Sequence, residues 1–322
     1  MNRLVLMVFA LLTTIASAQA QTYSTELESN AQVGDVDAQC VLGIYYYELG
    51  ESKKTHQGKW KSLPEYKNAT KWLKKASDKA NPRAQYYLGL CYIMGKGTNE
   101  NEFKGQELIY KSAISGYSRA QAFMANSCYW GMPRIDVSGE MTNKTDYENA
   151  FKWYYKAAIQ GDNIALNEML EYGYRNSLAA KWIEKVAKQG FLKAIRFMAN
   201  YYEDKDMATS LKWTKMAAEK GDTISQKTIL YLGIILYDQQ YYYKCIDYLN
   251  VASRYNVDDI SGYACLYLSK CYRYGRGVEQ DTLKSKKFFD KACAKGVDDA
   301  KSVSDLMREL ERQISNITSI SN

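Results

Sequence analysis

The feature that most constrains this chain is a pattern of small and aromatic residues that recurs along it. An aromatic residue is followed four positions later by alanine and eight positions later by glycine, as in Trp153-Ala157-Gly161, Trp213-Ala217-Gly221 and Phe288-Ala292-Gly296. These spacings fall on one face of a helix. A final glycine suits the left-handed residue that commonly ends a helix. The pattern therefore predicts a series of similar helices, each closed by such a cap.

Incomplete copies extend the series. Trp182 and Gly190 have Val186 between them, Trp72 and Ala76 end in Ala80, and Tyr248 and Ala252 end in Asn256. A small residue stands three positions before each aromatic: Ala69, Ala150, Ala179, Ser210, Cys245 and Ser285. We expect this position to face a neighbouring helix at close range, and we expect the alanine and asparagine ends to adopt the same left-handed cap.

A second helix is expected after each cap, because an alanine often follows the cap residue by four positions, as Ala38 follows Gly34 and Ala165 follows Gly161. These second helices carry a Leu-Gly-type pair and then tyrosine, as in Leu42, Gly43 and Tyr46. Such positions form a core stripe on a helix. Seven helix pairs are predicted, at residues 35–80, 81–116, 117–161, 162–190, 191–221, 222–256 and 257–296.

The pattern resembles the SEL-one-like repeat family, a relative of the tetratricopeptide repeats. The residues that carry the resemblance are the run LSKCYRYGRGVEQD from Leu268, the following KKFFDKA, the earlier Gly95-Lys96-Gly97 turn, and WYYKAAIQG from Trp153. The resemblance covers most of residues 30–300. It implies an all-α fold, a right-handed α/α solenoid of about seven helix-hairpin repeats with a C-terminal capping helix. It implies little about which partner is bound.

The ends of the chain predict a domain layout and a compartment. Arg3, a short apolar run at residues 4–12 and the small residues Ala18 and Ala20 indicate a signal peptide at residues 1–20. A lead-in at 21–34, the array at 35–296, a capping helix at 297–314 and a flexible tail at 315–322 follow. No later run reaches the ~18 apolar residues that span a bilayer. We expect export to the periplasm or the extracellular space and no membrane span.

Composition argues against catalysis and against nucleic acid. The chain has one histidine, His56, in a polar stretch, which disfavours a histidine-based triad or a multi-histidine metal site. The 43 basic and 36 acidic residues alternate along the expected helices, which is typical of solvated faces rather than a nucleic-acid interface. No Ser-x-x-Lys motif occurs. We expect no catalytic residue, no cofactor and no metal.

Seven cysteines remain after the expected signal cleavage, and most occupy core positions of the repeats, where buried thiols are expected. Cys265 and Cys293 differ, because one begins the first helix of a hairpin and the other ends its second helix. Antiparallel helices bring such ends together, so a disulfide between Cys265 and Cys293 is feasible if their Cα atoms lie within about 7 Å. Resemblance to cysteine-rich members of the family adds to this hypothesis. Free thiols remain the alternative.

The first helices of such pairs line the concave side of a solenoid, where a partner is expected. Positions offset from the core stripe predict a binding face made of Tyr86, Leu90, Asn126, Tyr129, Asn167, Glu171, Arg196 and Asn200, with Trp130 nearby. Mixed aromatic and polar residues suit a protein or peptide partner. The function expected from this architecture is non-catalytic binding of such a partner in the cell envelope or outside the cell.

Three alternatives remain open. A glycan could stack on exposed aromatic rings. The resemblance to cysteine-rich relatives also raises a penicillin-binding or β-lactam and cell-wall hydrolase activity. A quality-control adaptor in the endoplasmic reticulum would apply if the source were eukaryotic, which the sequence does not decide. Two long connections, at residues 50–65 and 131–146, lie at the edge where insertions gather in such arrays.

Overall fold

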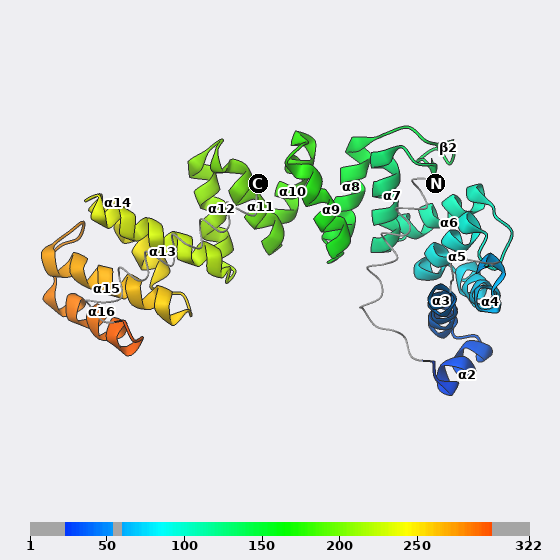
Figure 1. Cartoon of the computed structure of the whole chain (residues 1–322), viewed down its shortest axis with the longest axis horizontal. Coiled ribbons are helices and arrows are strands. Elements are labelled where there is room, and N and C mark those ends of the chain that lie inside the picture. The colour runs from blue at the N-terminus through cyan, green and yellow to red at the C-terminus, as the bar shows by residue number, and fades with distance from the viewer. Residues whose placement is uncertain (1–22, 54–59, 298–322) are drawn as a thin grey trace. The chain divides into compact units, whose positions relative to one another are not determined.

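The computed structural model describes residues 23–53 and 60–297. The expected signal peptide, His56, nearly all of the expected capping helix and the tail lie outside these residues. Within them the chain forms consecutive α-helices with one short β-hairpin (Figure 1). The predicted all-α class is confirmed.

Fifteen α-helices are present in the described part of the chain. In order, the elements are α2 (Thr25–Val33), α3 (Val36–Ser52), η2 (Trp60–Ser62), α4 (Pro64–Asp78), α5 (Pro82–Met94), α6 (Glu102–Ile114), α7 (Ser118–Trp130), β1 (Arg134–Ile135), β2 (Met141–Thr142), α8 (Tyr147–Ala158), α9 (Asn163–Gly173), α10 (Ser177–Lys188), α11 (Leu192–Glu203), α12 (Met207–Glu219), α13 (Thr223–Asp238), α14 (Tyr242–Ala252), α15 (Asp258–Tyr274) and α16 (Thr282–Ala294).

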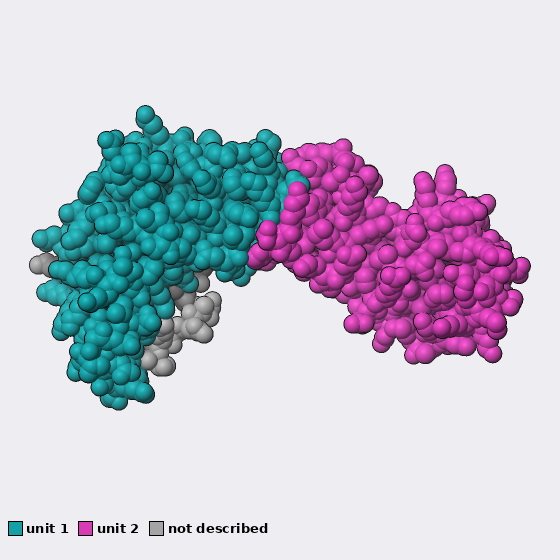
Figure 2. Space-filling view, turned by 180° about the vertical axis from the view of Figure 1, so that it is seen from behind, with its two compact units in different colours: residues 1–186 teal, residues 187–322 magenta. Residues whose placement is uncertain are grey.

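The helices pack as consecutive hairpins within two compact units, residues 1–186 and 187–322 (Figure 2). In the first unit the closest pairs are α3 with α4, α5 with α6, and α7 with α8. In the second unit they are α11 with α12, α13 with α14, and α15 with α16. Within each unit, hairpins also pack on the next one through the second helix, as α4 does on α5 and α12 does on α13. This is the repeating hairpin arrangement that the spacing predicts.

The helix ends explain why the pattern finishes in glycine. Gly161 and Gly221 both have φ of +87°, a backbone conformation that side chains disfavour. Ala80 adopts the same region at φ of +59°, as its place in the pattern predicts. The prediction is wrong for Asn256, which does not have positive φ. Its helix, α14, instead ends at Ser253 in a right-handed conformation.

Small residues in the second stripe allow close helix contact. A Cβ added at Gly43 would lie 2.8 Å from Leu73 Cγ, and one at Gly89 would lie 2.8 Å from the Gly105 carbonyl oxygen. These distances are shorter than any that a packed methyl group tolerates, so helices α3 and α5 approach their partners by leaving the methyl out. The small residue is therefore a packing requirement of the hairpin.

A recurring glutamine joins three of the hairpins to the helix before them. Its side-chain Nε2 donates to a carbonyl in the last turn of the preceding helix, at 2.9–3.1 Å, in three repeats: Gln39 to Ala31, Gln121 to Ala113 and Gln226 to Ala218. The last carbonyls of a helix lack intrahelical partners. The glutamine therefore caps one helix while it fixes the next one against it.

The long connection at 131–146 forms the antiparallel β1–β2 hairpin. Its turn is held by Asp136, whose carboxylate accepts from the Ser138 backbone N–H at 2.8 Å. Arg134 is buried and donates to the Ser127 carbonyl at 3.3 Å, which ties the hairpin to the end of α7. None of the helices in the described residues is both long and apolar enough to cross a membrane.

Candidate partner-binding site

Four rings gather at the C-terminal end of α7, and we call them the aromatic cluster: Tyr129 and Trp130 on α7, Tyr147 at the start of α8 and Tyr172 on α9. Tyr129 stacks on Tyr172 with ring centroids 3.9 Å apart and planes at 17°. Its ring contacts those of Trp130 and Tyr147 edge-on, with centroid distances of 5.1 and 5.2 Å. Trp130 and Tyr147 are each 46% exposed. The outer rings are thus held by an inner one and present apolar area to solvent.

A polar layer lies beneath these rings. It consists of Asn126 on α7, Tyr154 on α8 and Glu168 on α9, with Asn126 and Tyr154 almost fully buried. The Tyr154 hydroxyl donates to Asn126 Oδ1. One carboxylate oxygen of Glu168, Oε2, is buried without a hydrogen-bond donor in the described structure. A buried acceptor left without a donor costs free energy, and within this layer Asn126 and Tyr154 are the groups that can donate to the carboxyl.

Burial controls the protonation of this layer. It raises the pKa of the Glu168 carboxyl, and the hydrogen-bonding groups of Asn126 and Tyr154 offset only part of that shift. Burial, and then the nearby Glu168 charge, raises the pKa of Tyr172 to about 12. Tyr172 therefore stays neutral, whereas Glu168 gains from any cation that approaches it.

The rim of the site is polar. Glu171 and Asn167 are exposed on α9. Glu171 and Arg175 both act on the Tyr129 hydroxyl electrostatically, with opposite effects on its pKa. The arrangement is an aromatic surface with an acidic floor and a mixed rim, which can hold a flat or cationic side chain but carries no activated nucleophile.

The model of one protein family, the Sel1 repeat, matches residues 36–81, 82–117, 118–162, 194–222 and 262–297. Together these ranges make up more than half of the chain. This chain belongs to the Sel1 repeat family. The aromatic cluster lies in the third matched repeat and on α9, which follows it directly.

Solved structures of other Sel1-type proteins resemble the chain. A protective antigen of uropathogenic Escherichia coli that displays an SLR fold is 25% identical, with 84% of this chain and 56% of that chain covered and a TM-score of 0.40. A Sel1 repeat protein from Oxalobacter formigenes is 21% identical, with 82% and 98% covered and a TM-score of 0.36. The chain thus spans little more than half the length of the E. coli antigen.

The structure brings five of the predicted face residues together. Trp130, Asn167 and Glu171 are exposed, Tyr129 is half-buried and Asn126 is buried beneath them. The predicted open position of Asn126 is therefore wrong, because its side chain points into the polar layer toward Tyr154. It supports the surface and does not form part of it.

Two predicted face residues belong to the core of the first unit. Tyr86 and Leu90 are only 3% and 1% exposed, so their predicted place on an open face is wrong. Helix α5 packs against α3, α4 and α6, and the ring of Tyr117 lies 5.4 Å from that of Tyr86. The prediction assumes that the first helix of every pair has one side open to solvent. Helix α5 has no such side at Tyr86 and Leu90.

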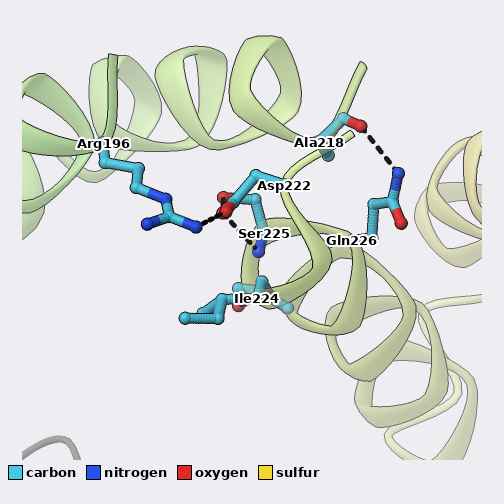
Figure 3. A network of polar contacts seen from close by, with 7 residues as sticks. Arg196, Ala218, Asp222, Ile224, Ser225 and Gln226 are labelled. Atoms are coloured by element: carbon cyan, nitrogen blue, oxygen red, sulfur yellow. Dashed lines mark hydrogen bonds and ion pairs between the residues drawn. The ribbon is translucent and has the colours of Figure 1, made fainter. Parts of the chain in front are cut away.

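The last two predicted face residues, Arg196 and Asn200, lie on α11 of the second unit and are exposed. The Arg196 guanidinium forms an ion pair with Asp222 (Figure 3), whose side chain is 1% exposed. Asp222 also caps α13, because it accepts from the Ser225 backbone N–H at 3.0 Å and from its hydroxyl at 2.6 Å. Arg196 thus compensates a buried carboxylate within the repeat.

The structure contains no bond between Cys265 and Cys293, so the bridge stays a prediction. Both are free thiols, with Cys265 buried and Cys293 exposed. Cys265 packs in a cluster with Ala292, and Cys293 is the next residue, turned about 100° further around α16. Cys265 lies in the middle of α15 rather than at its start, so that part of the prediction is wrong, and the residue packed in its cluster is Ala292.

Glu168, Tyr147, Tyr154 and Tyr172 were not among the predicted residues. One signal for Glu168 exists in the sequence. It stands three residues after Ala165, a position that other repeats fill with the rings of Tyr87, Phe123, Phe197 and Tyr267. A carboxyl in an aromatic register marks a departure from the core pattern. In the described residues no group of three or more metal-ligating side chains is gathered.

Proposed function

We propose that this Sel1 repeat protein is a non-catalytic scaffold that holds a protein or peptide partner at the aromatic cluster. The observation that carries the proposal is the pair of half-exposed rings, Trp130 and Tyr147, fixed by Tyr129 above a buried carboxyl with an unused oxygen. Aromatic side chains that are already ordered lose little entropy on binding. Membership of a family of repeat scaffolds supports the same function.

The chemistry of the site favours a basic segment. A lysine or arginine side chain can lie against the Trp130 face, where cation–π attraction acts. Its nitrogen can then donate to the Glu168 carboxyl or to the exposed Glu171. A charge-assisted hydrogen bond to a partly buried carboxylate is stronger than one between neutral groups. The partner is therefore a peptide or protein surface that presents a cation next to an apolar residue.

Site-specific photo-crosslinking tests this function. A photoreactive phenylalanine is placed at Trp130 and, as the matched control, at Phe103, which is 52% exposed on α6 of the same unit. We expect the Trp130 position to capture a defined protein in cells of the source organism, and the added change Glu171→Lys to reduce that capture at least tenfold. Equal capture at both positions, or none at Trp130, would count against the proposal.

The rival functions have their own readouts in the same purified protein. A captured species that is carbohydrate would favour a glycan partner. Turnover of nitrocefin or covalent labelling by penicillin that survives repurification would favour the hydrolase alternative. We expect neither, because the site offers rings and carboxyls without an activated nucleophile.

We further propose that the protein is exported and acts in the periplasm or outside the cell. Support comes from Arg3, the apolar run at residues 4–12 and the small residues before Gln21. The test is mass spectrometry of the fractionated protein. We expect a mature N-terminus at Gln21 outside the cytoplasm, and retention of the uncleaved chain when Leu11→Arg interrupts the apolar run. A cytoplasmic chain with Met1 intact would contradict export.

A further inference from the structure

Two buried thiols touch in the second unit. Cys245 lies on α14 and Cys271 on α15, both fully buried in one hydrophobic cluster. The two thiols are in hydrogen-bonding contact with each other. The Cys245 sulfur also lies 3.1 Å from the Tyr242 carbonyl oxygen. The two side chains therefore lie next to each other in the core of the second unit.

Backbone contacts hold the two helices at this point independently of the sulfurs. A Cβ on Gly277 would lie 2.5 Å from the carbonyl carbon of Tyr242, so the turn after α15 lies directly against the start of α14. The Arg276 backbone N–H donates to the Cys271 carbonyl at 2.9 Å. The segments that carry Cys245 and Cys271 are therefore fixed side by side.

We propose that Cys245 and Cys271 are an oxidisable pair whose disulfide joins the hairpin of α13 and α14 to α15. The oxidant is a small disulfide or a disulfide-exchange protein. The Cys245 thiolate attacks one oxidant sulfur and releases the other as a thiolate. The Cys271 thiolate then attacks the Cys245 sulfur of the mixed disulfide and releases the second oxidant thiol. Two protein thiols lose two electrons and two protons, and the oxidant gains them.

The environment favours this order. The Cys271 thiol donates toward Cys245 and so lowers the Cys245 pKa, while the same contact and burial raise the Cys271 pKa. Because the thiolate is the nucleophile, Cys245 attacks first. Both sulfurs are buried in the folded chain, so the oxidant reaches Cys245 during a local opening that leaves α14 beside α15 and keeps the contact between the two thiols. The finished bridge is then shielded from reductants.

The first unit contains a natural control for this pair. Cys91 stands at the same place relative to its glycine turn as Cys271 does, four residues before Gly95. Ala69 stands where Cys245 does, three residues after the tyrosine that contacts that turn. Cys91 therefore meets a methyl group where Cys271 meets a thiol. Only the second unit has this pair.

The test is refolding of the full chain from denaturant with oxidised and reduced glutathione, followed by unfolding without reductant and alkylation of free thiols. We expect five of the seven thiols to react, and peptide mapping to find Cys245 linked to Cys271. Cys245→Ala, which recreates the residue of the first unit, should leave all six remaining thiols reactive with unchanged circular dichroism. Seven reactive thiols in refolded wild type, or a bridge between other cysteines, would overturn the proposal.

A gain-of-function variant adds a second readout that does not depend on the native pair. Ala69→Cys places a thiol opposite Cys91, and we expect oxidative refolding to link these two residues as well. Circular dichroism checks that this variant folds. A folded Ala69→Cys protein that leaves Cys91 free would show that this register does not bring two sulfurs within bonding distance, which would also count against the pair in the second unit.

Discussion

The chain has two glycine turns, Gly95–Gly97 in the first unit and Gly275–Gly277 in the second. Their backbones are alike, but the basic residue between the two glycines has different partners in each turn. In both, the second glycine lies against the start of an earlier helix. A Cβ on Gly97 would be 2.2 Å from the Tyr66 carbonyl oxygen, and one on Gly277 would be 2.5 Å from that of Tyr242. Both glycines have positive φ. The close approach therefore requires glycine twice.

The cation between the glycines is held differently in each turn. Lys96 is fully buried and forms an ion pair with Glu51 and a 2.9 Å hydrogen bond to the Tyr47 hydroxyl. Arg276 is only half-buried. It donates to the Tyr237 hydroxyl and lies 5.3 Å from the centroids of the Tyr237 and Tyr242 rings.

In sequence register, counted from Gly43 and Gly233, the position of Glu51 corresponds to Tyr241, which lies beyond the end of α13 at Asp238. A buried ammonium needs a carboxylate, because removing it from water costs several kcal/mol. A planar guanidinium that keeps some water can be held by rings. The comparison teaches that the glycine pattern fixes the backbone while burial decides the charge partner.

The largest expected effect comes from breaking the shared feature. Gly97→Ala adds left-handed strain and a methyl group inside van der Waals contact of backbone, so we expect a loss of about 4 kcal/mol in unfolding free energy. Gly277→Ala should cost slightly less. Gly161→Ala is the matched control, because its φ is +87° but nothing lies near its added Cβ, and it should cost about 1 kcal/mol. Urea unfolding followed by circular dichroism measures all three. Equal losses in unfolding free energy for the three variants would show that the left-handed backbone strain alone, and not the contact of the added methyl group, determines the loss.

Next in size is the loss of the buried countercharge. Glu51→Gln leaves the Lys96 ammonium buried without its carboxylate, and we expect a loss of about 3 kcal/mol, at the lower end of the usual range because Glu51 is partly exposed. The double change Glu51→Gln with Lys96→Met should recover most of it. Tyr241→Phe at the equivalent place should stay within about 0.5 kcal/mol. A loss below about 1 kcal/mol in Glu51→Gln would place the pair with ordinary surface ion pairs.

A smaller effect is expected at the second turn. Arg276→Met removes the contacts to the Tyr237 hydroxyl and to three rings, those of Tyr237, Tyr242 and Tyr274, worth about 1 kcal/mol. Arg276→Lys should lose about half of that, because it keeps the charge but not the planar fork. Arg273→Met, at an exposed arginine in the last turn of α15, is the control and should be nearly neutral. If Arg276→Met were as costly as Glu51→Gln, the two turns would not differ in the way proposed.

The repeat architecture could be predicted from the sequence because its signals are requirements of the backbone. Gly43 must be small where Leu73 crosses it, and Gly161 must adopt a left-handed conformation. Every repeat has to meet the same conditions, so the spacing recurs and can be counted. The all-α hairpin fold and the Sel1 family followed from that regularity.

The site could be predicted only in part, because side-chain burial depends on what neighbouring repeats supply. The face offsets gave Glu171, which is exposed, but also Tyr86, which is buried beside the ring of Tyr117. The turn at Gly95-Lys96-Gly97 was recognisable, yet nothing local shows that Lys96 is buried, since its partner Glu51 lies 45 residues earlier. Counting the repeat spacing does not reveal departures from it. Glu168, at a position where other repeats have an aromatic residue, is such a departure and marks the site.

The smallest expected effect concerns Glu168, a partly buried carboxyl that has no lysine comparable to Lys96 beside it in the polar layer described above. Burial raises its pKa, so the folded chain keeps this proton at pH values where the unfolded chain has lost it. Its contribution to stability is fully present below the ordinary glutamate pKa and is lost as the pH rises through the raised value.

As the pH rises above the ordinary glutamate pKa, wild type should therefore lose stability relative to Glu168→Gln, with Glu171→Gln as the exposed control. If the unfolding free energies of wild type and Glu168→Gln changed in parallel with pH, burial would not raise the pKa of this carboxyl. A lysine peptide whose ammonium binds at Glu168 should remove the difference in pH dependence between wild type and Glu168→Gln. It would give this carboxyl an ion-pair partner, as Lys96 does for Glu51.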